Sequence, residues 1–340
     1  MDDRRAAARA LVLRYGWNAA AYQILNPGMT LWFSKGADAV AGYVRYGRTW
    51  VIAGAPVCAE ERLSDVSREI AAGAAGERCR VLFFGAGERL ERLYGRRMDH
   101  ARVLLGSQPV WHPAGWNRVV AHKASLRAQL HRAENKGVTV REWPSSRAAS
   151  AQALRRILDQ WLASRPLPPL GFMITPDLLG SLDDRRVFVA ERHGQPCAFL
   201  VATPVPARHG WLVEQWPRAP SAPNGTTQLM VDAAMRAFAA EQSEYVTLGL
   251  APLSHDALDG NAGTPGWLRF TLRAARDFGR RFYNFAGLEA FKAGLQPALW
   301  EPVYAIAQGP RFRPSMLLAI AGAFGHGSIA SLLIKGVIRI

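Results

Sequence analysis

The stretch from Gly210 to Ser254 holds the residues best suited to chemistry. Its strand pattern, Trp211–Trp216, carries one carboxylate, Glu214, where a Pro-rich loop begins. The loop contains Arg218 and ends at Asn224–Thr227, whose residues are good caps for a following helix. A helix N-terminus after a strand offers unpaired N–H groups, so this turn predicts a seat for a phosphate or carboxylate. The alternative is that the turn only starts the helix.

Two further elements must hold this turn in place. Apolar residues recur at helical spacing from Thr226 to about Gln242, and Tyr245–Leu250 has the composition of a strand. The order strand, loop, helix, strand predicts an α/β protein.

The N-terminal part of the chain alternates hairpins with helices. Residues 1–25 form a basic, Ala-rich helical segment, and Gly47-Arg48 is a hairpin turn. Strands are expected at Thr30–Phe33, Ala39–Tyr46, Thr49–Ala53 and Arg80–Phe84, and helices near Glu60–Ala72 and Gly87–Tyr94. This alternation predicts a sheet with mixed or antiparallel strands.

A second unit is expected after a Pro/Ser/Arg segment, Pro144–Ser150, which reads as a boundary or surface loop. The remaining expected elements are strands at Val138–Trp143, Arg186–Arg192, Ala198–Val205 and Val303–Ala307, and helices at Ala151–Ser164 and Trp267–Arg281. The resulting division is an N-terminal domain at residues 1–145, a C-terminal domain at 146–310 and an apolar tail at 311–340.

Residues 121–137 form the clearest amphipathic helix. Leu126, Leu130 and Ala133 share one face, and Gly137 supplies the C-cap. The charged side chains of this helix are Lys123, Arg127, Arg132 and Lys136. Two interpretations remain open: a solvated charged face, or a helix that contacts the phosphates of a nucleic acid.

The charge of the chain points to a polyanionic partner. It has 42 basic and 27 acidic residues, a net charge of +15, which favours nucleic acid, anionic lipid or both. The 3 cysteines and 8 histidines show no metal-ligand spacing, so no metal site is expected. Few cysteines and an N-terminus without an apolar signal core favour a cytoplasmic protein.

The C-terminal segment Pro314–Ile340 is nearly all apolar, but a Gly-His-Gly run at 325–327 interrupts it. About twenty consecutive apolar residues are needed to span a bilayer, so a clean span is not expected. We expect an in-plane membrane helix or two short helices packed on the core, with a buried terminal helix as the alternative.

Five segments occur in an order that suggests a family. They read GAPVC at 54–58, KASLRAQLHRAENKGV at 123–138, APNGTTQL at 222–229, LGLAPLS at 248–254 and FYNFAGLEAFKAGLQPALWEP at 282–302. Together they resemble the catalytic domain of bacterial phosphatidylglycerol lysyltransferases, the aminoacyl-phosphatidylglycerol synthases known as multiple peptide resistance factors. The family's multi-helix flippase is not recognisable, so the resemblance is to a stand-alone synthase.

The resemblance implies a tandem of two GNAT-like (acetyltransferase-like) domains, each a mixed sheet flanked by helices. It implies transfer of a lysyl, alanyl or similar group from charged tRNA to the hydroxyl of a membrane lipid such as phosphatidylglycerol. The co-substrate would be aminoacyl-tRNA, with no metal or other cofactor. The enzyme would lie at the inner face of the cytoplasmic membrane, and its product would change membrane charge and resistance to cationic peptides.

The resemblance carries over to a few positions. Glu214 replaces a family Asp and would accept the lipid hydroxyl's proton or hold the amino acid's ammonium. The family Arg falls on Pro217, with Arg218 displaced by one place as a phosphate ligand. Lys292 matches a family Lys and would bind phosphate or stabilise an oxyanion. The expected substrate-binding residues are Asn224, Gly225, Thr226, Ser254, Tyr283, Asn284 and Glu301.

Some of these roles have structural alternatives, because Tyr283 would also suit core packing and Glu301 a structural cap. Ala55 stands where the family has Asp, and with the shift at Arg218 this leaves the identity of the substrate open. The basic residues Lys123, Arg127, Arg132 and Lys136 would contact tRNA.

Two other functions remain as alternatives. A GNAT-type enzyme could use acyl-CoA or another donor, although the Asn224 turn lacks the usual Gly-rich CoA loop. A non-catalytic module could bind anionic membrane or RNA. An aminoacyl ester is already activated, so the transfer reaction needs proximity and acid–base help more than a covalent nucleophile.

Overall fold

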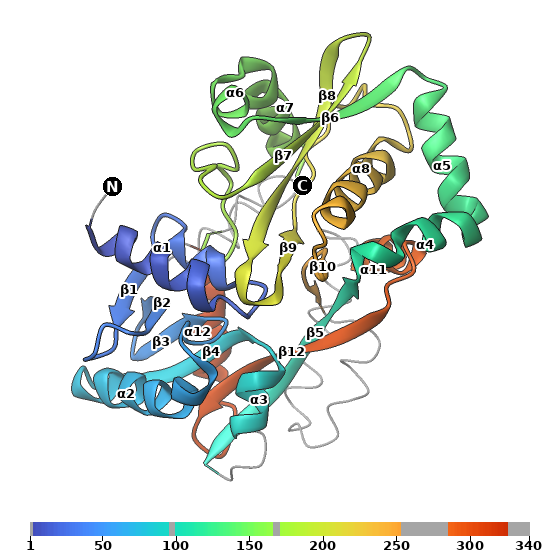
Figure 1. Cartoon of the computed structure of the whole chain (residues 1–340). Coiled ribbons are helices and arrows are strands. Elements are labelled where there is room, and N and C mark those ends of the chain that lie inside the picture. Colours follow the sequence, from blue (N-terminus) through green and yellow to red (C-terminus); the bar gives the residue numbers. More distant parts are fainter. Residues whose placement is uncertain (1–2, 95–98, 166–170, 253–284, 326–340) are drawn as a thin grey trace.

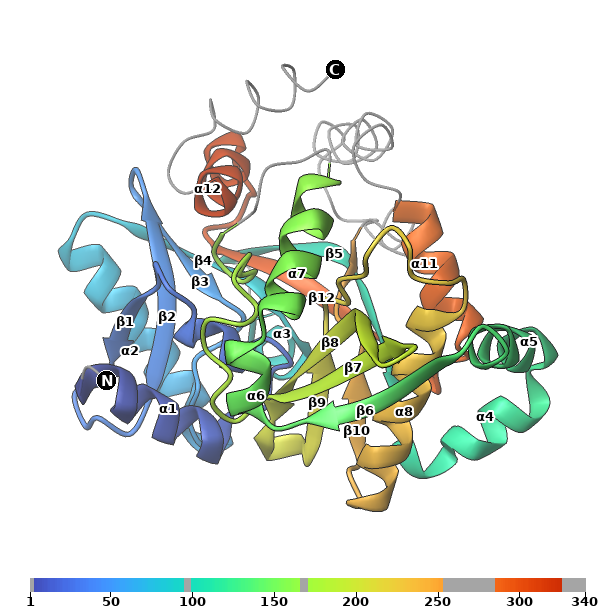
Figure 2. The ribbon, with the colours of Figure 1, turned by 90° about the horizontal axis from the view of Figure 1, so that it is seen from above.

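The computed structural model describes residues 3–94, 99–165, 171–252 and 285–325. Its strands form one mixed 12-stranded sheet in the order β1-β2-β3-β4-β12-β5-β10-β9-β8-β7-β6, with β11 beside β5. Helices cover both faces of this sheet (Figure 1 and Figure 2). The α/β class, with a mixed sheet flanked by helices, is therefore confirmed.

The strands alternate with the helices along the chain. The strands are β1 (Thr30–Phe33), β2 (Val40–Tyr46), β3 (Thr49–Ala53), β4 (Arg80–Ala86), β5 (His100–Trp111), β6 (Val138–Trp143), β7 (Arg186–Arg192), β8 (Gln195–Val205), β9 (Gly210–Val213), β10 (Tyr245–Thr247), β11 (Ala251–Pro252) and β12 (Leu299–Gln308). The α-helices are α1 (Asp3–Tyr15), α2 (Leu63–Gly76), α3 (Glu88–Tyr94), α4 (Trp116–His122), α5 (Ala124–Glu134), α6 (Ser145–Ser150), α7 (Gln152–Ala163), α8 (Thr226–Ala240), α11 (Phe285–Gly294) and α12 (Pro314–Phe324). Short 3-10 helices are η1 (Ala21–Leu25), η2 (Glu60–Arg62), η3 (Pro113–Gly115) and η4 (Pro206–Arg208).

The N-terminal half follows its predicted hairpins. β1, β2 and β3 pair antiparallel, whereas β3 and β4 are parallel and are joined through α2. α1 and α12 bury apolar residues on one face of these strands, and α2 and α3 do so on the other. The expected helix at residues 1–25 is shorter, because α1 ends at Tyr15 and the chain then forms η1.

Two long strands join the halves of the sheet. β5 was not predicted, because Gly106 and Pro109 interrupt its apolar pattern, and β12 is twice as long as the expected Val303–Ala307. β12 lies between β4 and β5, and β5 in turn pairs with β10. The division into domains at residues 145 and 310 stays a prediction, since the sheet runs continuously through both halves.

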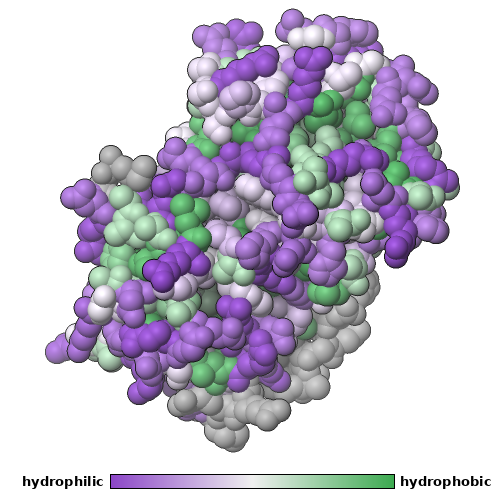
Figure 3. Space-filling model, in the orientation of Figure 1, coloured by the Kyte–Doolittle hydropathy of each residue, from purple (hydrophilic) through white to green (hydrophobic). Residues whose placement is uncertain are grey.

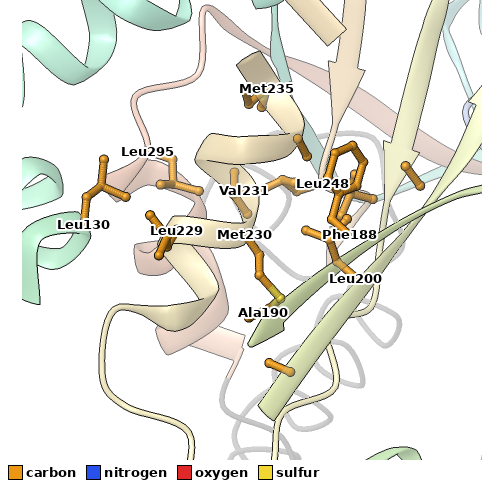
Figure 4. Packing of buried hydrophobic residues seen from close by; sticks show 14 of the residues in the cluster. Leu130, Phe188, Ala190, Leu200, Leu229, Met230, Val231, Met235, Leu248 and Leu295 are labelled. Atoms are coloured by element: carbon orange, nitrogen blue, oxygen red, sulfur yellow. The ribbon is translucent and has the colours of Figure 1, made fainter. Parts of the chain in front are cut away.

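The largest core cluster lies around α8 in the C-terminal half. Figure 4 shows Met230 and Val231 of α8 pointing towards Phe188, Leu200 and other residues of the sheet, while residues outside the sheet close the helix's other side. α6 and α7 cover the opposite face through a separate cluster. This layering places the carboxyl ends of β9 and β10 between the helical layers.

Two predicted segments differ in detail from the structure. The helix expected at 121–137 is broken at Lys123, whose extended backbone (φ -99, ψ 90) separates α4 from α5. Residues 145–150, expected as a loop, form α6. The helix expected at Trp267–Arg281 lies outside the described residues.

The described part of the apolar tail packs on the protein core. α12 buries Met316, Ala319 and Ala323 against β2 and β3, and Gly322 lies so close to the ring of Tyr46 that an added Cβ would be 2.1 Å from it. None of the described helices is long and apolar enough to cross a bilayer. The tail therefore contributes core packing up to residue 325, and an in-plane membrane role for the rest stays a prediction.

Candidate active site

The site lies where two parallel strands end. β9 and β10 are parallel, with Gly210 opposite Tyr245 and Leu212 opposite Thr247. Their carboxyl ends meet at one edge of the sheet, which is where α/β proteins commonly bind ligands. Glu214 directly follows β9, and Gly249 and Leu250 follow β10.

Lys292 reaches this edge from α11. It has 2% of its surface exposed, and its Nζ donates to the carbonyls of Gly249 (2.8 Å) and Leu250 (2.9 Å). The indole of Trp111 on β5 donates to the carbonyl of Leu295 (2.9 Å), which fixes the segment that follows α11. Lys292 thus holds the backbone turn beside Glu214.

Gly249 separates the carboxylate from the ammonium. Its φ is +72°, and a Cβ built there would lie 3.0 Å from Cγ and 3.2 Å from Oε1 of Glu214. Both the backbone conformation and the close approach favour glycine. The glycine of LGLAPLS therefore has a physical role: it lets Glu214 lie directly against the turn that Lys292 holds.

Partial burial of Glu214 and full burial of Lys292 move the two pKa values towards each other. Loss of solvation raises the pKa of Glu214 to about 7, although the charges of Lys292 and Arg185 oppose this rise. Loss of solvation also lowers the pKa of Lys292 to about 7, with Glu214 opposing it. A carboxyl group with a pKa near 7 can exchange protons at physiological pH, so Glu214 suits acid–base chemistry.

A residue from the N-terminal half completes the surroundings of Glu214. The side chain of Gln23 in η1 donates from Nε2 to Oε2 of Glu214 (3.0 Å). Asn26 donates in turn from Nδ2 to Oε1 of Gln23 (3.2 Å). The sequence analysis missed Gln23, because it lies 191 residues from Glu214 in a segment read only as helix. No motif marks it.

The structure does not bring Arg218 to Glu214. Arg218 is exposed and forms a bridge with Ala198 of β8, whereas Val213 pairs with Ala202. Four residues of β8 separate these two pairs, so Arg218 lies roughly 13 Å farther along the strand than Val213. The partner segment uses five residues, from Val213 to Arg218, to span the same length. It therefore contains one extra residue, a β-bulge, close to Glu214.

The start of α8 packs against α5 instead of facing a cavity. Gly225 lies so close to α5 that a Cβ there would be 2.1 Å from the carbonyl oxygen of Gln129. The hydroxyl of Thr226 is buried and donates to the carbonyl of Pro223 (2.7 Å). Of the Asn224–Thr227 turn, only Asn224 is exposed. This geometry favours the simpler interpretation of the turn as a helix start.

Glu301 lies at the other end of β9. Arg208, which precedes β9, makes a two-pronged ion pair with it (2.9 and 2.5 Å), and Gln108 donates to the same carboxylate (3.0 Å). These contacts lower the pKa of Glu301 despite its burial. Its position favours the structural alternative, because it joins β12 to the segment before β9.

The basic helix divides into two kinds of residue. Arg127 of α5 donates to the carbonyls of Val120 (3.0 Å) and Ala121, and so caps the end of α4. Arg132 and Lys136 are exposed, and Lys123 is half-buried at the break between the helices. Figure 3 shows that hydrophilic residues cover most of the face on which α5 lies. The apolar face of α5 is confirmed, since Leu126, Leu130 and Ala133 are all buried.

The remaining expected site residues, Ser254, Tyr283 and Asn284, lie outside the described residues. Within the described part of the chain, no group of three or more His, Cys, Asp or Glu residues is arranged to hold a metal ion.

The fold and the site define a class: an α/β protein with a mixed sheet and a carboxylate beside a buried lysine at the end of two parallel strands. The model of one family, described as "Phosphatidylglycerol lysyltransferase, C-terminal", matches residues 9–307. The chain belongs to this family, as its motifs suggested. Membership supports an acyltransferase that acts on a phosphatidylglycerol-type lipid.

Solved structures support the same fold. The C-terminal domain of a putative lysylphosphatidylglycerol synthetase from Agrobacterium fabrum is 23% identical, covers 96% of this chain and 98% of its own, and has a TM-score of 0.79. L-PGS from Bacillus licheniformis is 20% identical over 94% of this chain and 96% of its own, with a TM-score of 0.76. FemX is 9% identical over 93% and 98%, with a TM-score of 0.53. No curated protein sequence matches the chain.

Proposed function

We propose that this protein transfers an aminoacyl group from aminoacyl-tRNA to a hydroxyl group of phosphatidylglycerol. The observation that carries the proposal is the placement of Glu214. Glu214 lies against Gly249 and accepts a hydrogen bond from Gln23. Lys292 is close enough for its charge to lower the pKa of Glu214. The chain that carries this arrangement belongs to the lysyltransferase family.

Glu214 acts as the general base. Its carboxylate accepts the proton of the lipid hydroxyl while that oxygen forms a bond to the aminoacyl carbonyl carbon. The ester bond to the tRNA ribose then breaks, and Glu214 returns the proton to the departing ribose oxygen. A base that titrates near pH 7 is effective in both directions of proton transfer. The reaction consumes no energy-rich cofactor, because the aminoacyl ester is already activated.

Lys292 acts as a positioning residue. It is too buried to grip a lipid or tRNA phosphate, and both of its hydrogen bonds go to the backbone. Its charge favours the ionised form of Glu214 and so lowers the pKa of that carboxyl. This role replaces the expected phosphate or oxyanion contact.

The tRNA donor and the membrane location are parts of the same proposal. The exposed cations Arg132 of α5 and Lys136, which follows α5, would contact tRNA phosphates, which accords with the net charge of +15. An acceptor in the bilayer requires the protein to work at the inner membrane surface. Adding a cationic amino acid to that lipid would make the membrane less anionic and reduce binding of cationic peptides.

A transfer assay tests this function. The full-length protein is mixed with tRNA charged with labelled amino acids and with phosphatidylglycerol vesicles, and the lipids are then extracted. We expect label in the lipid phase, and no label when the tRNA is first digested with RNase. An unlabelled lipid phase with intact charged tRNA and folded protein would refute the proposal, and acyl-CoA donors would then be tested.

A further inference from the structure

A cavity reaches Asn26, which is linked to Glu214 by two hydrogen bonds through Gln23. It has a volume of about 320 Å³ and is bounded by α1, η1 and the segment from Thr175 to Arg185. Gln215, the residue after Glu214, donates from Nε2 to the carbonyl of Thr175 at the cavity wall (3.4 Å). Its volume is at the lower end of the range for small-molecule sites, about 300–1,000 Å³.

Arg185 is the buried cation of this cavity. The residue is 7% exposed, and its Nε has no hydrogen-bond partner in the described part of the chain. Its Nη2 donates to Oδ1 of Asn26 over a long 3.4 Å. The other two arginines of the cavity are engaged, since Arg5 donates to the carbonyl of Leu25 and Arg9 forms an ion pair with Asp184.

A buried guanidinium with an unmet donor disfavours folding, so stability alone does not account for Arg185. The ring of Tyr22 lies 5.4 Å from its guanidinium carbon, and this contact leaves the N–H groups available. The guanidinium fork matches two oxygens of a phosphate or carboxylate. The unpaired Nε–H of this buried guanidinium therefore indicates an anionic ligand.

A chain of buried amides joins Arg185 to the catalytic carboxylate. Arg185 donates to Asn26, Asn26 to Gln23, and Gln23 to Glu214. Gln23 and Asn26 are 5% and 4% exposed, so packing fixes the spacing between guanidinium and carboxylate. A single molecule can thus place an anionic group on Arg185 and a hydroxyl near Glu214.

We propose that Arg185 binds the phosphodiester of the acceptor lipid's headgroup and so directs the headgroup hydroxyl towards Glu214. This inference rests on the lipid acceptor proposed above. A lipid suits the position, because the segment that leads to the cavity wall at Thr175 contacts an apolar helix. The amide of Gly171 donates to the carbonyl of Phe324 at the end of α12 (3.0 Å), and Leu318 of α12 is 53% exposed.

Binding of the deacylated headgroup, glycerophosphoglycerol, to the full-length protein tests the inference without catalysis. We expect Arg185→Gln to weaken binding in calorimetry at least tenfold, and Arg185→Lys to weaken it too, since lysine lacks the fork. Arg186→Gln is the matched control. This neighbouring arginine pairs with Glu142 and Glu241 outside the cavity, and its variant should bind within twofold of wild type.

Three results would overturn the inference: no binding of the headgroup to wild type, equal binding to Arg185→Gln, or inorganic phosphate binding as tightly as glycerophosphoglycerol. The last result would assign the cavity to free phosphate. In the transfer assay at pH 8.5, where the lost charge of Arg185 matters least for the ionisation of Glu214, Arg185→Gln should raise the KM for phosphatidylglycerol vesicles with little change in kcat. Arg185-dependent headgroup binding without any transfer would instead refute the proposed function and leave this binding site in place.

Discussion

At the scale of single residues, three groups from different elements meet at one backbone turn: Glu214, Gly249 and Lys292. Motif matching selected Glu214 and Lys292, but their relationship is visible only in three dimensions. Lys292 is buried. It binds two backbone carbonyls and acts on Glu214 through its charge.

Lys292→Met should shift the pH dependence of transfer. The lysine's charge lowers the pKa of Glu214, so its loss should raise that pKa above about 7. Less carboxylate is then ionised at pH 7, and we expect roughly fivefold slower transfer there for a rise of about one unit. The rate should recover towards wild type as the pH rises to 8.5. A uniform loss at every pH would contradict this role.

Gly249→Ala should lower the transfer rate far more than its loss of folding stability would explain. The new Cβ would displace Glu214, and a misplacement of about 1 Å can cost about 100-fold in rate. Gly194→Ala is a matched control: Gly194 has φ +75° in the β7–β8 turn, with no atom within 4 Å of an added Cβ. Both variants should lose about 1–2 kcal/mol to backbone strain in thermal unfolding. Equal activity in the two variants would contradict the close-contact argument.

At the scale of elements, apolar periodicity predicted most strands and helices, because each of them covers a core with one face. It failed where tertiary contacts override local pattern. β5 contains Gly106 and Pro109 but pairs on both sides, and Lys123 breaks a continuous helical pattern because Arg127 caps α4. Gln23 could not be found at all, since its partner Glu214 is distant in sequence.

Arg127 and the exposed pair Arg132 and Lys136 predict different phenotypes. Arg127→Gln should lower the free energy of unfolding by about 1 kcal/mol, because it removes the charged cap of α4. The double change of Arg132 and Lys136 to Gln should leave thermal stability unchanged and weaken tRNA binding. The slope of log affinity against log salt concentration should also become shallower, by roughly 0.7–0.9 per lost phosphate contact. If tRNA affinity and its salt dependence were unchanged, these charged residues would be only a solvated face without a tRNA contact.

At the scale of the whole molecule, the continuous sheet brings together groups from both ends of the chain. Gln23 from η1, Glu214 after β9 and Lys292 from α11 meet at one edge. The class of fold and the family could be predicted from ordered motifs. The way the halves interlock could not, because it depends on β12 inserting between β4 and β5.

Glu301 belongs to this interlock. Its pair with Arg208 is partly exposed (16% for Arg208 and 24% for Glu301), so Glu301→Gln should cost about 1–2 kcal/mol in thermal unfolding. Well below the melting temperature, transfer should proceed at close to the wild-type rate. A stable Glu301→Gln protein with greatly reduced transfer would show that Glu301 contacts the substrate after all.

The most direct test of the central claim is the pH dependence of single-turnover transfer from charged tRNA to phosphatidylglycerol. The wild-type rate should rise with pH through an inflection near 7, because only ionised Glu214 accepts the hydroxyl proton. Glu214→Gln should lose at least about 100-fold and the inflection with it, since general bases typically contribute 10²–10⁴-fold. A Glu214→Gln protein that retains the wild-type rate and inflection would contradict the account.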